Sequence, residues 1–360
     1  PPAVLTNQDL ATFLETNDEW ITSRTGISER RVAHTLPSEM AHVAGARALA
    51  CADLPAEDLE QIIYGSCSND EQVPNSASGV QFRLGAAKAA AMDVNTACTS
   101  FSYALSTATA MIRTGVVSNA LVIGVEAISP YMDWENRNVA VLFGDGAAAV
   151  VLQASEAEEG LVGETLGCIA DARHALRVRG IGGAYTNAGI MMGDTYWDFN
   201  GQEIFKRAVK GMVAASTSVM AKCEVSAAEI DLVVPHQANL RIIMALIERL
   251  GVPQEKAMLT VQRYGNMSAA TVPVALVEAL EEGRVAPGAM ILMPAFGGGL
   301  TLASHLVRWG QRVTPLGTTD VDLPPCTHTG LELVNAIRKA KAPADRSTER
   351  LRARVFPDTP

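Results

Sequence analysis

The chain has 360 residues, of which 48% are hydrophobic and 19% are charged. This balance excludes a disordered protein, because disorder requires low hydrophobicity and high charge. The formal charge of −10 argues against a general nucleic-acid binder, although it is compatible with a local basic patch. No apolar run reaches the roughly 20 residues that a membrane-spanning helix requires, so we expect neither nucleic acid nor a membrane as a partner.

The cysteines indicate a reducing compartment. Six are scattered along the chain, with no CxxC pair and no histidine at ligand spacing. This pattern argues against a disulfide framework and a zinc site, so we expect no metal and a cytoplasmic location. The chain starts with Pro1 and Pro2 rather than Met, and we expect a leading segment to have been removed.

Apolar runs alternate with alanine-rich stretches along most of the chain, which predicts a layered α/β protein. Aromatic residues make up only 5%, which favours close packing of helices on sheets. The predicted buried strands are Gln61–Tyr64, Ala120–Val125, Val139–Phe143, Ala147–Leu152, Leu232–Val234 and Met290–Met293. The predicted helices are Phe101–Arg113, Gln202–Lys222, Leu240–Leu250 and Ala269–Glu282.

An internal repeat relates the two halves of this pattern. Cys98 and Asn266 each precede a predicted helix and lie 168 positions apart, as do the glycines that close the two helices, Gly115 and Gly283. A strand follows in each case, and Phe-Gly-Asp-Gly at 143–146 matches Phe-Gly-Gly-Gly at 296–299. We therefore expect two halves of like topology, residues 1–158 and 159–310, joined near Ala154–Gly163.

Residues 311–360 differ from the two halves. They are rich in proline and contain the charged run Arg346–Arg354. We expect an extension with one short helix, Leu331–Lys341, and a loose end.

Three residues are candidates for chemistry. Cys98 lies where a strand meets a helix, and the helix dipole at such a position lowers a thiol pKa; the alternative is a packed cysteine. His236 follows a buried strand, where α/β sheets place catalytic groups, or it simply bonds the backbone there. Asn266 is either a helix N-cap or, through its register with Cys98, part of the same site.

The chain resembles the thiolase-fold condensing enzymes, most closely the β-ketoacyl-acyl-carrier-protein synthase III family. The segments that carry the resemblance begin at Thr16 (TNDEWITSRTGISER), Pro235 (PHQANLRII), Gly265 (GNMSAA) and Ala295 (AFGGG). The resemblance extends from Pro2 to about Trp309. Cys98, His236 and Asn266 follow one another in the family's Cys-His-Asn order. The resemblance implies a five-layer αβαβα fold and a homodimer, with a first strand expected before Pro1.

The implied reaction has two steps. Cys98 would take an acyl group from acyl-CoA, with the N–H groups of Cys98 and Gly298 as the oxyanion hole. The acyl-enzyme would then condense with malonyl-acyl-carrier protein, with His236 and Asn266 stabilising the enolate left by loss of CO2. The product would be a 3-oxoacyl thioester that initiates fatty acid biosynthesis, and no bound cofactor is implied.

The resemblance also implies supporting residues. Trp20, Arg24 and Arg137 match positions that bind CoA, and Asn239 matches a residue that hydrogen-bonds the catalytic His. Phe296 matches a residue that shields the cysteine, and Gly201 belongs with the acyl pocket. Arg241 matches a docking position for the acidic carrier protein, and the basic residues that we expect to complete this patch are Lys206, Arg207, Lys210 and Arg249.

Several positions depart from the family pattern. Val73-Pro74 replaces a Phe-Pro at the acyl-pocket gate that the dimer partner contributes, which favours longer or branched primers. Thr99 and Ser100 replace small residues and would narrow the entrance, and Glu248 stands where a basic docking residue is frequent.

The alternatives are a specialised relative and a Cys-His thioesterase. The relative would join two acyl groups, make a quinolone-type product or transfer an acyl group. The thioesterase would need a carboxylate or amide that orients His236 as a general base. A non-catalytic acyl-binding protein fits less well, because the whole triad is present.

Overall fold

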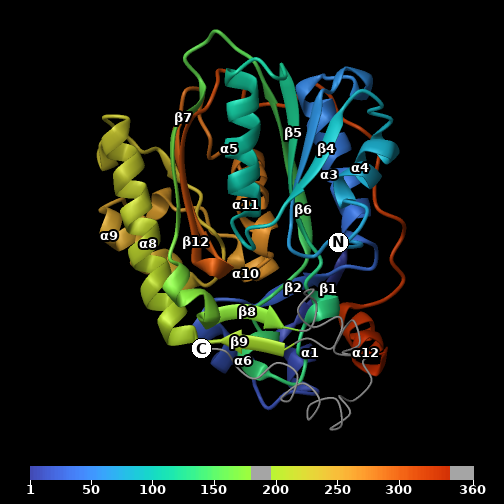
Figure 1. Ribbon diagram of the computed structural model, residues 1–360. Helices are drawn as coiled ribbons and strands as arrows, with labels where there is room; N and C mark the ends of the chain where they lie inside the picture. Colours follow the sequence, from blue (N-terminus) through green and yellow to red (C-terminus); the bar gives the residue numbers. More distant parts are fainter. Residues whose placement is uncertain (180–195, 341–360) are drawn as a thin grey trace.

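The computed structural model describes residues 1–179 and 196–340, and its elements form five layers (Figure 1). Two four-stranded sheets enclose the central helices α5 and α11. Helices α3 and α4 cover the outer face of the first sheet, and α8 and α9 cover the outer face of the second. The predicted αβαβα order is confirmed. These helices span Pro37–Ala52 (α3), Ser76–Leu84 (α4), Ser100–Arg113 (α5), Gly201–Lys222 (α8), Leu240–Leu250 (α9) and Thr271–Glu281 (α11).

The two sheets share a mixed topology. The first has the order β4-β3-β5-β6, with β3 parallel to β4 and β5, and β6 antiparallel to β5. The second has the order β10-β11-β12-β7, with β10 parallel to β11 and the other pairs antiparallel. The strands are Gln61–Gly65 (β3), Ala90–Val94 (β4), Asn119–Glu126 (β5), Gly146–Gln153 (β6), Gly160–Cys168 (β7), Leu232–Val233 (β10), Met290–Gly297 (β11) and Thr301–Arg308 (β12).

The sequence repeat corresponds to this shared topology. In each sheet a parallel pair, β3-β5 or β10-β11, continues into an antiparallel partner, β6 or β12. The residues before Cys98 and Asn266 both have positive φ, 54° at Ala97 and 62° at Gly265. The two turns are therefore equivalent corners of the two sheets.

Small residues allow the central helices to lie directly on the sheets, as the composition predicts. A Cβ atom at Gly124 of β5 would stand 2.6 Å from the carbonyl oxygen of Ala269. A Cβ at Gly65 of β3 would stand 2.8 Å from the backbone nitrogen of Phe101. Neither position has room for a side chain, so glycine sets the spacing between the layers.

One predicted strand, Val139–Phe143, is wrong. This segment forms the short helix α6 (Arg137–Ala140) and a turn, and the Asn136 side chain caps the helix by accepting a hydrogen bond from Asn138 N. The segment is buried among apolar side chains, and the buried Arg30 guanidinium donates to Val141 O at 2.7 Å. A buried apolar run satisfies its backbone here without a sheet, which periodicity alone does not reveal.

A smaller substructure lies at the lower end of the layers in Figure 1. It contains the antiparallel pairs β1-β2 and β8-β9 together with short helices. None of the helices within the described ranges is long and apolar enough to cross a membrane. The elements of this substructure are β1 (Ala3–Thr6), α1 (Asn7–Ala11), α2 (Asp18–Thr25), β2 (Glu29–Val32), η2 (Ser129–Tyr131), α6, β8 (Leu176–Arg179), β9 (Tyr196–Phe199) and α10 (Val261–Tyr264).

The extension contains the predicted helix, α12 (Gly330–Ala340), which packs beside β1. The segment before it, residues 310–329, is bound to the body of the protein: Leu316 N and Arg312 Nη1 both donate to Cys51 O at the end of α3. The loose end expected after Lys341 lies outside the described residues.

Candidate active site

Cys98 lies in a tight turn between β4 and α5. The turn is held by Ser100, whose hydroxyl donates to Ala97 O at 2.6 Å and accepts from Thr96 N at 2.9 Å. Ala97 has a left-handed conformation, which turns the chain sharply before the cysteine. Cys98 is buried two residues before the first residue of α5. The predicted corner position of the thiol is therefore confirmed.

Burial decides the acidity of this thiol. It raises the pKa of Cys98 to about 11, and the charge of the buried Glu126 acts in the same direction. Hydrogen bonding by the Ser268 hydroxyl and by the backbone N–H groups of Cys98 and Gly298 opposes this rise in pKa without overcoming it. A position at a helix start predicts a lowered thiol pKa. This prediction is wrong for Cys98, because burial penalises the charged thiolate and raises the pKa instead.

This pKa predicts a steep pH dependence of thiol reactivity. We expect the rate of Cys98 alkylation by iodoacetamide to rise about tenfold per pH unit between pH 7 and 9, because the thiolate fraction grows in that proportion below the pKa. Peptide mapping by mass spectrometry would follow Cys98 separately from the other cysteines. A plateau below pH 8 would show that the thiol is already ionised near neutrality.

His236 is fully buried at the end of β10. Its backbone N–H donates to Pro294 O at 2.9 Å, and the ring of Phe296 lies edge-on to the imidazole at 5.2 Å between centroids. The Nδ1 atom lies 2.6 Å from the Thr271 hydroxyl oxygen, and Nε2 has no hydrogen-bond partner within the described part of the chain. Burial lowers the pKa of His236 to about 3, so the ring is neutral at physiological pH.

Asn266 belongs to the turn before α11. Its side-chain oxygen accepts the N–H of Ser268 at 2.8 Å, which leaves the amide NH2 group to donate elsewhere. Its backbone is fixed to the other half of the chain, because Asn266 N donates to Leu142 O and Asn266 O accepts from Gly144 N. Asn266 is not the N-cap of α11, a position that Ala270 occupies.

Ser268 connects the three candidates. Its N–H donates to the Asn266 side-chain oxygen, and its hydroxyl hydrogen-bonds the Cys98 thiol, which lowers the thiol pKa. Its carbonyl oxygen lies 2.9 Å from the Thr271 hydroxyl, which also contacts His236. The structure thus gathers Cys98, His236 and Asn266 around one serine, whose own backbone is left-handed with φ 48°.

The buried carboxylate of Glu126 fixes this serine. Its oxygens accept from the hydroxyls of Ser268 at 2.9 Å and Ser68 at 2.6 Å, and from Cys67 N at 3.2 Å. These donors come from the turn after β3 and the turn after Asn266, so one carboxylate at the end of β5 ties the two turns together. Burial raises the pKa of Glu126, while the donated hydrogen bonds lower it.

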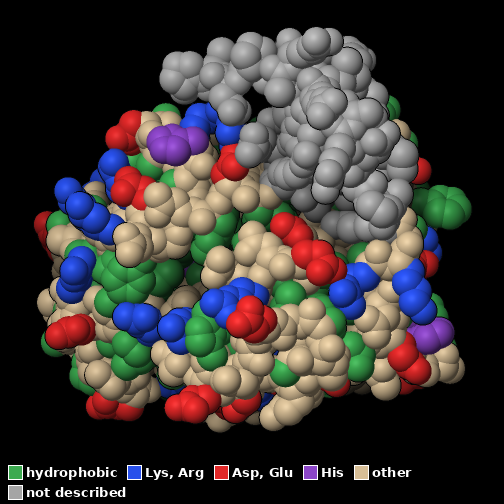
Figure 2. All heavy atoms as spheres, turned by 90° about the horizontal axis from the view of Figure 1, so that it is seen from below, with side chains coloured by type: hydrophobic (Ala, Val, Ile, Leu, Met, Phe, Trp, Pro, Cys, Tyr) green, Lys and Arg blue, Asp and Glu red, His purple; other side chains and the backbone are tan. Residues whose placement is uncertain are grey.

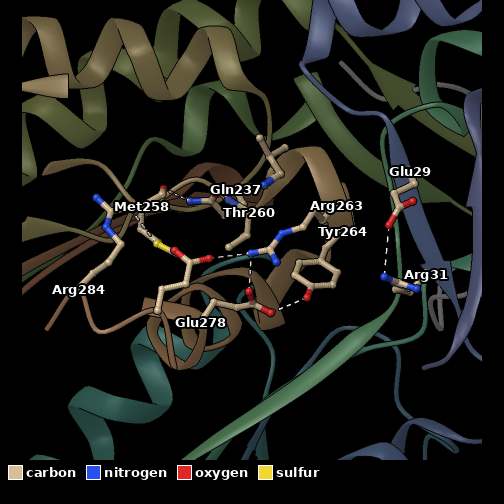
Figure 3. Close-up of polar contacts among 11 residues, drawn as sticks. Glu29, Arg31, Gln237, Met258, Thr260, Arg263, Tyr264, Glu278 and Arg284 are labelled. Carbon is tan, nitrogen blue, oxygen red and sulfur yellow. Dashed lines mark hydrogen bonds and ion pairs between the residues drawn. The ribbon is translucent and has the colours of Figure 1, made fainter. Parts of the chain in front are cut away.

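Two further braces hold the turns of His236 and Asn266 (Figure 3). The Gln237 amide donates to Pro235 O and Met258 O and accepts from the N–H groups of Thr260 and Val261. The Tyr264 hydroxyl donates to Glu278 of α11, which also pairs with Arg263. Backbone on both sides of the site is thereby anchored by buried or paired side chains.

Comparison with known proteins places this geometry in a family. The C-terminal family model of 3-oxoacyl-[acyl-carrier-protein] synthase III matches residues 220–309, and the companion synthase III model matches residues 92–169. The chain is 50% identical over 335 residues to β-ketoacyl-[acyl-carrier-protein] synthase III 2 of Vibrio cholerae, covering 93% of this chain and 92% of that protein. The chain belongs to the β-ketoacyl-acyl-carrier-protein synthase III family.

Solved structures of this family agree with the fold. The 3-oxoacyl-[acyl-carrier-protein] synthase III of Aquifex aeolicus is 42% identical and superposes with a TM-score of 0.80, covering 86% of this chain and 96% of that chain. The enzyme from Pseudomonas aeruginosa is 34% identical with a TM-score of 0.81, covering 88% of this chain and 96% of that chain. The predicted family and thiolase-like fold are confirmed, and the protein is a condensing acyltransferase.

The three residues expected to bind CoA in this synthase lie together. The Trp20 ring of α2 has the guanidinium carbons of Arg24 and Arg137 at 4.4 and 5.1 Å from its centroid. Arg137 Nη1 also donates to Glu15 O at 2.7 Å, which links α6 to the loop before α2. We call Trp20, Arg24 and Arg137 the CoA clamp.

Among the other expected positions, Asn239 differs from the prediction. The Asn239 side chain donates to Arg24 O and caps α9 by accepting Arg241 N, and it makes no bond to His236 among the described residues. The predicted hydrogen bond from Asn239 to His236 is wrong, because the Asn239 side chain instead caps the first turn of α9. Gly201 is exposed at the first position of α8, and Val73 is 87% exposed before Pro74.

The basic residues expected to form the docking patch lie on α8 and α9. Lys206, Lys210, Arg241 and Arg249 are exposed, whereas Arg207 is paired with Glu203 and Asp171. On the face seen in Figure 2, Lys and Arg side chains surround an apolar depression. No group of three or more His, Cys, Asp or Glu is placed to hold a metal ion within residues 1–179 and 196–340.

Three residues around the candidate triad, Ser268, Thr271 and Glu126, are missing from the sequence prediction. Ser268 lies two positions after Asn266 in the GNMSAA motif, Thr271 directly follows that motif, and Glu126 ends the strand after the Cys98 helix. Polar residues at the end of a buried strand or the start of a buried helix are the signal that points to them.

Proposed function

We propose that this protein loads an acyl group from acyl-CoA onto Cys98 and condenses it with a malonyl thioester of acyl carrier protein. The product is a 3-oxoacyl thioester, which starts fatty acid biosynthesis. The observation that carries the proposal is the convergence of Cys98, His236 and Asn266 around Ser268, in a chain of this family.

In the first step the Cys98 sulfur attacks the thioester carbonyl of acyl-CoA. CoA leaves as the thiol and takes up the proton that Cys98 gives up. Backbone N–H groups of Cys98 and Gly298 stabilise the oxyanion, and both hydrogen-bond the Cys98 sulfur in the structure. A Cβ at position 298 would stand 3.2 Å from Leu176 O and 3.4 Å from the Ala97 Cβ, so glycine suits this close approach of the two turns.

In the second step the malonyl thioester loses CO2, and its enolate oxygen accepts hydrogen bonds from His236 and Asn266. The enolate carbon then attacks the acyl carbonyl carbon and breaks its bond to the Cys98 sulfur; the thiolate released takes up a proton from solvent. Neutral donors suit this task, since the burial of His236 keeps the ring uncharged. The free NH2 group of Asn266 supports the same role.

Thr271 decides which ring nitrogen of His236 carries the proton. The Thr271 hydroxyl lies 2.6 Å from Nδ1 and 2.9 Å from the Ser268 carbonyl oxygen, and its single hydrogen can be donated to only one of them. The role proposed for His236 requires that this hydrogen be donated to Nδ1. With Nδ1 as acceptor, the proton lies on Nε2 and points into the site. Thr271 is therefore a positioning residue.

Thr271→Val is expected to lower the rate of malonyl decarboxylation about 10- to 100-fold while leaving acylation of Cys98 unchanged, as for loss of a group that orients a catalytic ligand. Thr271→Ser keeps the hydroxyl and serves as the matched control. Release of CO2 and the acyl-enzyme mass are the two measurements. Equal loss of both in the Val variant, or a Ser variant as slow as Val, would contradict the assignment.

A thioesterase fits this site less well. Such an enzyme needs a carboxylate or amide to orient His236 as a general base. The partner of Nδ1 is instead a hydroxyl, and the Asn239 amide is engaged in capping α9. A specialised relative that condenses other acyl groups or transfers an acyl group would use the same three residues. Its products would distinguish it from the proposed enzyme.

A homodimer is the second part of the proposal. Strand β4 is an edge strand that pairs only with β3 in the described part of the chain. Phe82 of α4 is 84% exposed and Val73 is 87% exposed. An open strand edge with apolar neighbours favours pairing with a second copy, and Val73 is then available as the gate residue of the partner's acyl pocket.

Carrier-protein docking and location complete the proposal. Arg241, Arg249 and Lys206 supply positive charge for an acidic carrier, in a protein whose net charge is −10. All six cysteines are unpaired, which supports a reducing cytoplasm.

Intact-protein mass spectrometry after mixing with acyl-CoAs of graded length tests the proposal. We expect one acyl adduct, absent from Cys98→Ala, and the chain length that reacts fastest identifies the primer. Adducts that persist in the Ala variant, or CoA release without any 3-oxoacyl product when malonyl-acyl-carrier protein is added, would overturn it.

A further inference from the structure

The C-terminal extension reaches the substructure that carries the CoA clamp. Residues 310–329 cross the surface from β12 to β1, fixed by the bonds to Cys51 O, by the Arg47–Asp322 ion pair and by a hydrogen bond between His34 and Pro324 O. They deliver α12 to the lower end of the molecule in Figure 1. Both family models end before this extension, the later at residue 309.

The apolar face of α12 shares a hydrophobic cluster with the clamp. Val334 is fully buried in a cluster with Leu5, Leu10 and Trp134, and Trp20 packs against the same cluster. The start of α12 touches β1 closely, since a Cβ at Gly330 would stand 2.4 Å from Val4 O. Helix α12 is therefore docked tightly rather than resting on the surface.

The polar end of α12 ties two segments together. The Arg338 guanidinium pairs with Glu135 at 3.0 Å and lies over the Phe13 ring at 4.3 Å. Phe13 and Glu135 stand two residues before Glu15 and Arg137, which are themselves joined by the bond from Arg137 Nη1 to Glu15 O. The segment 13–15 and the segment 135–137 are therefore linked twice, once through Arg338 and once through the bond from Arg137 to Glu15.

We propose that α12 is a positioning element for the nucleotide end of CoA, in which Arg338 holds Arg137 and Trp20 in their binding arrangement. The proposal rests on the proposed function, because it takes Trp20, Arg24 and Arg137 as the CoA clamp. It assigns to the extension an effect on CoA recognition and none on the bond-making steps at Cys98.

Comparison of two thioesters tests this role. Acyl-CoA carries the nucleotide, and the acyl-pantetheine with the same acyl group lacks it. In the full chain, Arg338→Ala is expected to raise KM for acyl-CoA about three- to tenfold with kcat unchanged, the loss typical of one partly exposed ion pair and one cation–π contact. The kcat/KM for acyl-pantetheine should not change. The Kd of free CoA, measured by calorimetry, should rise by the same factor.

Two further variants control for general destabilisation. Glu135→Gln removes the partner of Arg338 at an exposed position and should shift KM for acyl-CoA in the same direction. Arg47→Ala breaks the exposed ion pair to Asp322, away from the clamp, and should change neither substrate. Equal losses with both thioesters, or an unchanged CoA affinity, would overturn the proposal. If the unaltered protein binds CoA but neither thioester acylates Cys98, the proposed function fails instead, and the Kd comparison still decides the role of α12.

Discussion

Cys98→Ala is expected to abolish condensation, by a factor of about 10³ or more, and yet to retain the release of CO2 from the malonyl thioester. The first effect follows because no other residue can hold the acyl group between the two steps. The second follows because His236 and Asn266 are held by Thr271 and Ser268 and not by the thiol. Radiolabelled malonyl thioester would report CO2 and 3-oxoacyl product from one reaction.

The control for this experiment is Cys67→Ala. Cys67 lies close to the same residues as Cys98, since its thiol donates to the Glu126 carboxylate at 3.3 Å and lies 3.9 Å from the Ser268 hydroxyl. Burial raises the pKa of Cys67 well above its ordinary value and its thiol hydrogen is donated to Glu126, so we expect it to stay protonated and take no acyl group. Condensation by Cys98→Ala at near the original rate would show that another nucleophile carries the acyl group.

The site was largely predictable because it stands on a repeat. Cys98 and Asn266 occupy equivalent corners, and a fixed offset in the sequence predicts both corners without any knowledge of side chains. The residue before each corner has a positive φ, at Ala97 and at Gly265. His236 was predictable for a different reason, because it directly follows a buried strand.

The acidity of Cys98 could not be predicted from sequence. A helix start lowers a thiol pKa, but the burial of Cys98 and the nearby charge of Glu126 both raise it. Both effects depend on residues distant in sequence. The strand predicted at Val139–Phe143 was wrong for a similar reason, because its backbone is bonded in part by residues distant in sequence, Arg30 at Val141 O and Asn266 at Leu142 O.

The extension shows the same limit. Its composition predicts an appendage with one helix, and the helix is present. Only the tertiary contacts of Arg338 and Val334 show that it packs against the segments of the CoA clamp. Composition reports how a segment differs from the rest of a chain and says nothing of where it docks.

His236→Ala is expected to show the reverse of Cys98→Ala. Acylation of Cys98 should continue, since the N–H groups of Cys98 and Gly298 hold that oxyanion, whereas decarboxylation should fall about 10²- to 10³-fold through loss of one hydrogen-bond donor to the enolate. Asn266→Ala should behave alike, because both groups serve the same oxygen.

The pH profile separates this donor role from a base role. Since burial lowers the pKa of His236 to about 3, the ring is neutral throughout pH 5 to 8, and decarboxylation should show no inflection from its titration in that range. A base would instead be needed for acylation, so His236→Ala would then stop adduct formation first. Loss of the acyl-enzyme in His236→Ala, with CO2 release retained, would assign His236 to the first step and leave Asn266 as the donor of the second.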